Sequence, residues 1–190
     1  GKSGSPLVIN GVSANNMFIY TTPDMGGATL SASYINGGGS VAAPEGSTSF
    51  AIKLAPEAME GLTLGMGVSN NTTAESVDTD ETTAYLTYAT GGITVGVQSS
   101  DLDITTAGSD QESMAYGITY AVNDDMSIGY SYHELETEST SDEDQKSTGV
   151  SASYTMGGMT LAGAMNDVDN MGGTAATDRE GYEFTLSFAF

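Results

Sequence analysis

The chain has 190 residues, of which 38% are hydrophobic and 15% are charged. Only 4 lysine and arginine residues stand against 25 aspartate and glutamate residues, so the formal net charge is −21 at pH 7. This charge excludes nucleic acid as a partner and disfavours anionic membrane surfaces, because both are bound through lysine and arginine. The absence of cysteine excludes a disulfide scaffold, a cysteine nucleophile and thiolate metal sites.

Residues 1–13 come before the first regular pattern in the chain. The opening residues, GKSGSPLVING, lack the basic start and the apolar centre of a signal peptide. No apolar run in the chain approaches the roughly 18 residues that a transmembrane helix requires. We therefore expect the chain to be either a mature protein or a fragment.

From residue 14 onwards, hydrophobic residues recur at every second position, which predicts β-strands. Eleven segments follow this pattern: 14–22, 27–36, 47–55, 61–70, 81–90, 92–101, 112–122, 126–136, 146–156, 159–168 and 181–190. Each has about ten residues, the length of a tilted strand that crosses a membrane. Strands of soluble proteins more often have about 5–6 residues.

The two faces of each segment differ in composition. In 61–70, Leu62, Leu64 and Met66 form an apolar face, and threonine, glycine and serine form the other. The second face is too small to build a packed core. A soluble β-sandwich would bury one face and place charged residues on the other. Here we expect charged residues to be scarce on both faces, with Lys53 and Glu183 as the main exceptions within strand centres.

Short and long connections alternate along the chain. The short ones are 23–27, 56–61, 91–92, 123–125 and 157–158, and the long ones are 37–46, 71–80, 101–111, 137–145 and 169–180. This alternation is typical of outer-membrane barrels, whose short turns face the periplasm and whose long loops face outwards.

Charged and aromatic residues follow the same division. We place 19 of the 25 acidic residues in or beside long loops, five at short turns and only Glu183 inside a strand. The aromatic residues are expected to form two girdles at the membrane interfaces. By parity, one girdle holds Tyr34, Phe50, Tyr132 and Tyr182, and the other holds Tyr20, Tyr88, Tyr120, Tyr154 and Phe190.

Two stretches resemble the general porins of Gram-negative bacteria, most closely the alphaproteobacterial type. NNMFIYTTPDMGGATLSASY (15–34) resembles the strand–turn–strand unit of that family, and AYGITYAVNDDMSIGYSY (115–132) resembles its recurrent hairpin. The resemblance covers nearly the whole chain. It implies an all-β, transmembrane, antiparallel up-and-down β-barrel of the bacterial outer membrane, usually a homotrimer, through which small hydrophilic solutes diffuse without enzymatic activity.

The resemblance also implies that part of the barrel is missing. Porins of this family have sixteen strands, and single-chain bacterial barrels have an even number. The eleven segments would then form the C-terminal portion, with 14–190 as one barrel domain. Residues 1–13 would be the end of an extracellular loop that folds into the pore.

The small, polar face of the segments supplies the candidate pore-lining residues. They are Ile19, Lys53, Thr63, Thr94, Gln98, Ser127, Ser131, His133 and Glu183. Family porins often line one wall of the constriction with arginine and lysine, but the pore-parity residue beside Tyr20 is Ile19 and no cluster of bases appears. Lys53 is expected to be the only well-placed base that faces the pore. His133, the only histidine, is interpreted as a polar lining residue.

The acidic run 134–146 has two interpretations. Asp142, Glu143 and Asp144 offer the carboxylate oxygens that Ca²⁺ prefers. The alternative is a solvated acidic loop, and no segment closely matches the calcium-loop pattern Asp-x-Asp-x-Asp-Gly. No other cofactor is indicated.

The last segment alternates perfectly up to an aromatic end. The resemblance implies that Tyr182, Phe184, Phe188 and Phe190 form the signal that the barrel assembly machinery reads. The partners we expect are this machinery, outer-membrane lipid and further copies of the chain.

The sequence thus predicts a passive diffusion pore. Acidic rims attract cations, so we expect a weak preference for cations. Two alternatives stay open: a surface structural or adhesive barrel with acidic loops that bind Ca²⁺, and a soluble acidic β-protein.

Overall fold

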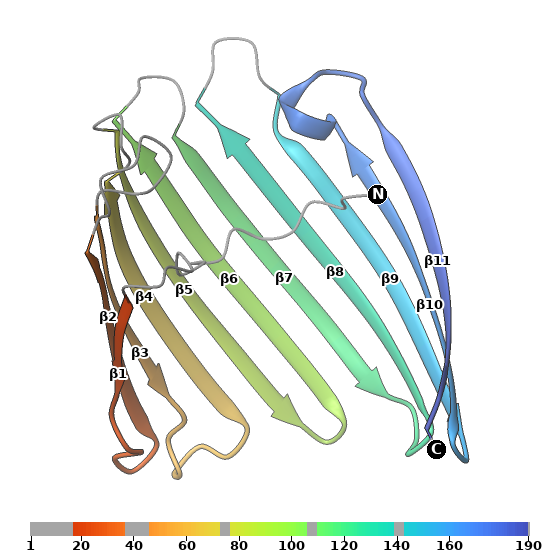
Figure 1. Ribbon diagram of the computed structural model, residues 1–190. Coiled ribbons are helices and arrows are strands. Elements are labelled where there is room, and N and C mark those ends of the chain that lie inside the picture. Colours follow the sequence, from red (N-terminus) through yellow and green to blue (C-terminus); the bar gives the residue numbers. More distant parts are fainter. Residues whose placement is uncertain (1–16, 37–45, 73–76, 106–109, 139–142, 190) are drawn as a thin grey trace.

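The computed structural model describes residues 17–36, 46–72, 77–105, 110–138 and 143–189. In this part of the chain, eleven strands form one antiparallel sheet in which each strand pairs with its neighbours in sequence (Figure 1). The strands are β1 (Met17–Thr21), β2 (Ala28–Asn36), β3 (Gly46–Leu54), β4 (Leu62–Thr72), β5 (Asp78–Thr90), β6 (Ile93–Ile104), β7 (Gln111–Ala121), β8 (Met126–Thr137), β9 (Gln145–Met156), β10 (Met159–Asp169) and β11 (Arg179–Phe188). A short 3₁₀ helix, η1 (Met171–Gly173), follows β10.

Every predicted segment overlaps one strand, so the predicted all-β, antiparallel up-and-down architecture is confirmed. Among the described strands, β1 and β11 each have a single neighbour, and the sheet is open between them. No helix formed by the described residues is long and apolar enough to cross a membrane. The predicted loop 1–13 lies outside the described residues.

The connections alternate in length as expected. The short turns gather at one end of the sheet, at the bottom of Figure 1, and the longer connections at the other. We call these the short-turn end and the long-loop end. β5 and β6 are joined by Gly91 and Gly92 alone, with φ values of 54° and 82°. Two successive positive φ angles match the twist of a two-residue hairpin, which explains why glycine occupies both positions.

Hydrophobic side chains cover the outside of the sheet rather than a core. Among the described residues, the only buried hydrophobic ones are Ile35 and Val168. Phe18, Phe184 and Tyr182 are exposed by 66%, 75% and 79%. A water-soluble protein rarely exposes so many large apolar side chains together. The same surface is favourable when hydrocarbon is the solvent and the polar backbone groups are paired within a sheet.

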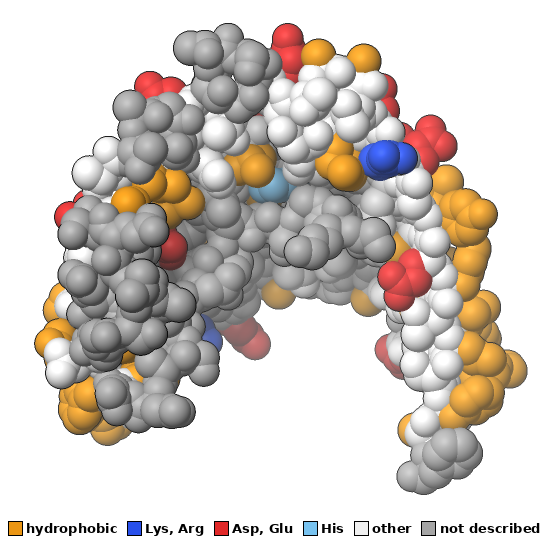
Figure 2. Space-filling model, turned by 45° about the horizontal axis from the view of Figure 1, so that its top comes forward, with side chains coloured by type: hydrophobic (Ala, Val, Ile, Leu, Met, Phe, Trp, Pro, Cys, Tyr) orange, Lys and Arg blue, Asp and Glu red, His pale blue; other side chains and the backbone are white. Residues whose placement is uncertain are grey.

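The strand register assigns each residue to one of two faces, since directly opposed residues share a face. Phe18, Leu30, Val97 and Phe184 mark the apolar face, which we call the outer face. The other, which we call the inner face, contains serine, threonine and glycine at most positions. Figure 2 shows a horseshoe-shaped sheet with hydrophobic side chains along the outer side of its limbs.

The strands reach further towards the long-loop end than predicted. β5 begins at Asp78, and its first residues are held by β4. Asn70 Nδ2 donates a hydrogen bond to Asp80 Oδ1 at 2.6 Å, and Thr72 Oγ1 donates one to Asp78 Oδ1 at 2.7 Å. The prediction that Glu183 is the only acid inside a strand is therefore wrong, because paired backbone and cross-strand hydrogen bonds extend the sheet into sequence that is rich in acids.

Candidate functional site

All nine residues predicted to line a pore lie on the inner face. The register brings three of them into one row across the sheet. Lys53 opposes Gly65, which opposes Tyr85, which opposes Gln98. The row continues through Ala115 to His133. The remaining six (Ile19, Thr63, Thr94, Ser127, Ser131 and Glu183) lie in other rows of the same face.

The inner face of the strands carries almost no charge. Its charged side chains are two acids, Glu81 and Glu183, and two bases, Lys53 and Arg179. The prediction that Lys53 is the only base facing this side is wrong, since Arg179 opposes the inner-face residue Val168. β11 begins before the predicted segment, which is why the sequence pattern missed it.

The sheet buries polar residues on its inner face, whereas it exposes hydrophobic residues on its outer face. Eight buried polar residues all lie on the inner face: Ser47, Ser69, Asn71, Ser100, Ser113, His133, Gln145 and Ser147. Several form hydrogen bonds with neighbouring hydroxyl groups on the same face, as Ser100 does with Thr83 and Ser69 with Ser49. Such hydroxyl pairs satisfy each other and leave further lone pairs for water or solute.

His133 lies on the inner face beside two serines. Its Nε2 atom lies 3.2 Å from Ser113 Oγ on β7. Its Nδ1 atom and the Oγ atom of Ser147, the residue opposite on β9, are buried and form no hydrogen bond within the described part of the chain. The imidazole of His133 is thus enclosed by serine hydroxyl groups of β7 and β9, which fits its interpretation as a polar residue of the inner face.

A hollow of about 510 Å³ lies along the inner face of β5 to β10. Its floor contains Gly96, Gly117, Gly129 and Gly149, and Gly96 directly opposes Gly117. A Cβ atom on Gly149 would lie 2.8 Å from Asn166 Oδ1 and from Ser131 Oγ. The glycines therefore keep the wall thin and leave its amide and hydroxyl groups in place.

Tyr85 is an inner-face aromatic that sequence reasoning missed. Its ring lies across Gly65 on the neighbouring strand, in the space that a Cβ atom of residue 65 would occupy. Aromatic rings that cover a glycine on an adjacent strand protect the exposed backbone there. Within β5, alternation places Tyr85 on the face that does not contain Leu86 and Tyr88, so its inward position can be predicted from the sequence. That the ring covers Gly65 follows only from the strand register.

Acids gather on the outer face at the long-loop end. Ten strand acids have outer-face parity: Asp78, Asp80, Asp101, Asp103, Glu112, Glu134, Glu136, Asp167, Asp169 and Glu180. Lys146 is the only strand base on this face in the described part of the chain. The expectation that both faces are poor in charge is correct for the inner face and wrong for the long-loop end of the outer face.

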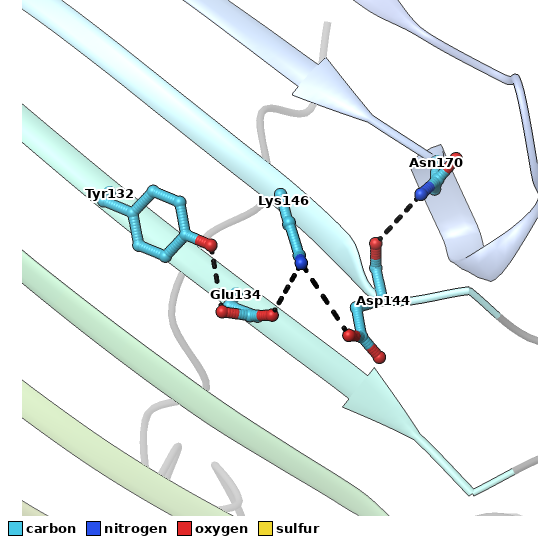
Figure 3. A network of polar contacts seen from close by, with 5 residues as sticks. All are labelled: Tyr132, Glu134, Asp144, Lys146 and Asn170. Carbon is cyan, nitrogen blue, oxygen red and sulfur yellow. Dashed lines mark hydrogen bonds and ion pairs between the residues drawn. The ribbon is translucent and has the colours of Figure 1, made fainter.

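Lys146 organises a polar network on the outer face (Figure 3). Its Nζ atom lies 3.2 Å from Glu134 Oε1 and 3.9 Å from Asp144 Oδ2. Tyr132 donates its hydroxyl hydrogen to Glu134 Oε2 at 2.9 Å, and its ring stacks on Tyr116 at a centroid distance of 4.9 Å. A tyrosine pair that ends in a charged cluster is the arrangement expected where hydrocarbon gives way to water.

The other predicted residues are only partly described. Tyr182, Phe184 and Phe188 lie on the outer face of β11, as expected, and Phe190 lies outside the described residues. Asp142 also lies outside them, whereas Glu143 and Asp144 precede β9. Within the described ranges, no three histidine or acidic side chains converge on a possible metal site. Calcium binding at 142–144 stays a prediction.

A sequence model of the Gram-negative porins matches residues 2–170. The chain belongs to this family. Its place is therefore the bacterial outer membrane, and a soluble acidic β-protein is ruled out. The narrower resemblance to alphaproteobacterial porins stays a prediction. None of the curated protein sequences compared with this porin gave a significant match.

Solved structures of outer-membrane proteins share the fold. An anion-selective porin from Comamonas acidovorans superimposes with a TM-score of 0.80 at 16% identity, over 93% of this chain and 60% of that one. OmpT of Vibrio cholerae gives a TM-score of 0.67 at 15% identity, over 90% of this chain and 63% of that one. The NanC porin gives 0.55 at 11% identity and is covered over 92% of its length. The porin chain thus spans about 60% of the first two structures.

Proposed function

We propose that this porin forms a passive, non-enzymatic channel for small hydrophilic solutes, and that the nine predicted residues line it. The observation that carries the proposal is the distribution of polarity across one sheet. The outer face exposes Phe184 and Tyr182, whereas the inner face buries serines and His133. A wall that is apolar outside and polar inside suits a water-filled lumen crossing hydrocarbon.

We also propose that the sixteen-stranded closure and the homotrimer implied by the family resemblance apply here. The open sheet and the 60% coverage of the Comamonas porin support the former. The exposed aromatic residues Tyr182, Phe184 and Phe188 support contacts with lipid, and recognition of β11 by the assembly machinery.

A weak cation preference is the finer part of the proposal. It is supported by the net charge of −21 and by acids in the described loop residues, such as Asp110, Glu138 and Asp178. The anion selectivity named for the Comamonas porin belongs to that protein. At 16% identity, likeness of fold does not carry over the charges of its lining.

The full-length porin is expected to produce stepwise increases in conductance when it inserts into planar bilayers. Under a salt gradient, the reversal potential is expected to have the sign that indicates greater permeability to cations than to anions. Acidic groups around an aqueous opening raise the local cation concentration, which is the reason for the sign. Detergent buffer without protein is the control. A reversal potential of the opposite sign would contradict the cation preference alone.

Absence of conductance in correctly assembled protein would contradict the channel itself. That result would favour the alternative of a surface structural or adhesive barrel, because such a barrel has no need of an open lumen. Addition of Ca²⁺ then becomes informative, since the alternative assigns its function to loop acids such as Glu143 and Asp144.

A further inference from the structure

The large negative charge of the chain is not a charge on the pore wall. Ten acids and Lys146 lie on the outer face of the strands, whereas the inner face carries two acids and two bases. The formal charge of the inner strand face is therefore zero with His133 neutral. Overall composition and lining charge give different expectations for ion selectivity.

Outer-face acids are poorly placed to act on ions inside the lumen. Asp101 and Glu112 oppose each other on β6 and β7 and project away from the inner face. Their field reaches the lumen only through the sheet or around its rim. Salt screens the second route over a distance of about 10 Å at 0.1 M and about 3 Å at 1 M. Glu134 is in addition paired with Lys146 at 3.2 Å.

No part of the sheet lies between the inner-face charges and the solution inside the lumen. Glu183 is exposed on the inner face of β11, and its contact within the sheet is a hydrogen bond of 3.2 Å from Thr185 Oγ1. Lys53 is exposed on the inner face of β3. Neither forms an ion pair within the described ranges of the chain. Both charges therefore act on the solution that they face.

We propose that the inner-face charges, Glu183 and Lys53 among them, set the ion preference of the pore wall, with acids and bases acting in opposite directions, and that the outer-face acids contribute nothing to it. The inference rests on the proposed channel function and adds the residues that discriminate ions. It also explains why a chain of charge −21 would have only a weak preference: the wall is balanced, and only loop acids tip it towards cations.

The test measures the cation-to-anion permeability ratio of single variants of the full-length porin in planar bilayers. Glu183→Gln is expected to lower the ratio by about twofold, and Lys53→Met to raise it by about twofold. A unit charge about 10 Å from an ion in water changes the ratio by about fourfold without salt, and screening by 0.1 M salt reduces this to about twofold. The matched outer-face controls, Glu112→Gln and Lys146→Met, remove the same charges and are expected to leave the ratio unchanged.

Equal shifts in inner-face and outer-face variants would overturn the inference, and so would unchanged ratios in both inner-face variants. Lys53→Gln serves as a second variant at that position if Lys53→Met does not assemble. Unmutated protein that does not conduct would overturn the channel function and the inference with it. Unmutated protein that conducts, with variants that fail to shift the ratio, overturns the inference alone.

Discussion

Replacing Ile118 by arginine is expected to lower the free energy of unfolding by about 2–4 kcal/mol, the cost of a base on the lipid face near the middle of a bilayer. Ile118 lies on the outer face of β7 between Tyr116 and Tyr120, and it opposes Val95 on β6 and Tyr130 on β8. Its side chain is 44% exposed. Unfolding by urea in lipid vesicles measures the change.

The neighbouring residue provides a matched control. Thr119 follows Ile118 in β7 and opposes Thr94 and Gly129 on the inner face. Thr119→Arg adds the same side chain at the same depth, but towards water, and is expected to cost less than about 1 kcal/mol. Equal costs at the two positions would contradict the assignment of faces on which the channel proposal depends.

The sequence predicted the number, order and faces of the strands because one physical signal determines all three. Alternation with a period of two survives in every strand, since a one-residue shift would turn the hydrophobic side chains of that strand towards the lumen. The turn positions followed from glycine pairs such as Gly91 and Gly92, which permit a two-residue hairpin. Both signals are local, so a single sequence suffices to detect them.

Strand ends were predicted less well, for a reason visible at β5. Asp78 and Asp80 fall in the long connection predicted over 71–80, and acids are in general depleted from strands. In the structure each accepts a hydrogen bond from β4, from Thr72 and Asn70. The β-strand propensity of a residue takes no account of its neighbours, whereas these hydrogen bonds depend on which residue of the adjacent strand lies opposite. The charge of the inner face was misjudged for the same reason at Arg179.

The contact between Tyr85 and Gly65 also depends on the strand register. It reverses the effect on stability that is expected when alanine replaces a strand glycine. Alanine in place of a strand glycine normally stabilises by about 0.5–1 kcal/mol, because glycine loses more conformational freedom on folding. At residue 65 the new Cβ atom would overlap the Tyr85 ring. Gly65→Ala is therefore expected to destabilise the porin by about 1 kcal/mol, since the ring must leave the wall.

The displaced ring should also narrow the lumen, because Tyr85 lies on the inner face. Single-channel conductance of Gly65→Ala is therefore expected to fall below that of the unmutated protein. In the Tyr85→Ala background the obstacle is absent. There, Gly65→Ala is expected to stabilise by about 0.5–1 kcal/mol and to leave conductance unchanged. The coupling between the two positions is then about 1.5–2 kcal/mol, within the range for residues in contact.

Gly96 distinguishes this coupling from a general effect of inner-face glycines. A Cβ atom on Gly96 would meet its nearest neighbour, Thr87 Cγ2, at 3.5 Å, an ordinary van der Waals distance. Gly96→Ala is therefore expected to stabilise by about 0.5–1 kcal/mol with or without Tyr85. If Gly65→Ala behaved in the same way in the presence of Tyr85, the ring would not lie on Gly65. The row that joins Lys53 to Gln98 across the inner face would then need another register, because Gly65 and Tyr85 are the residues that connect them.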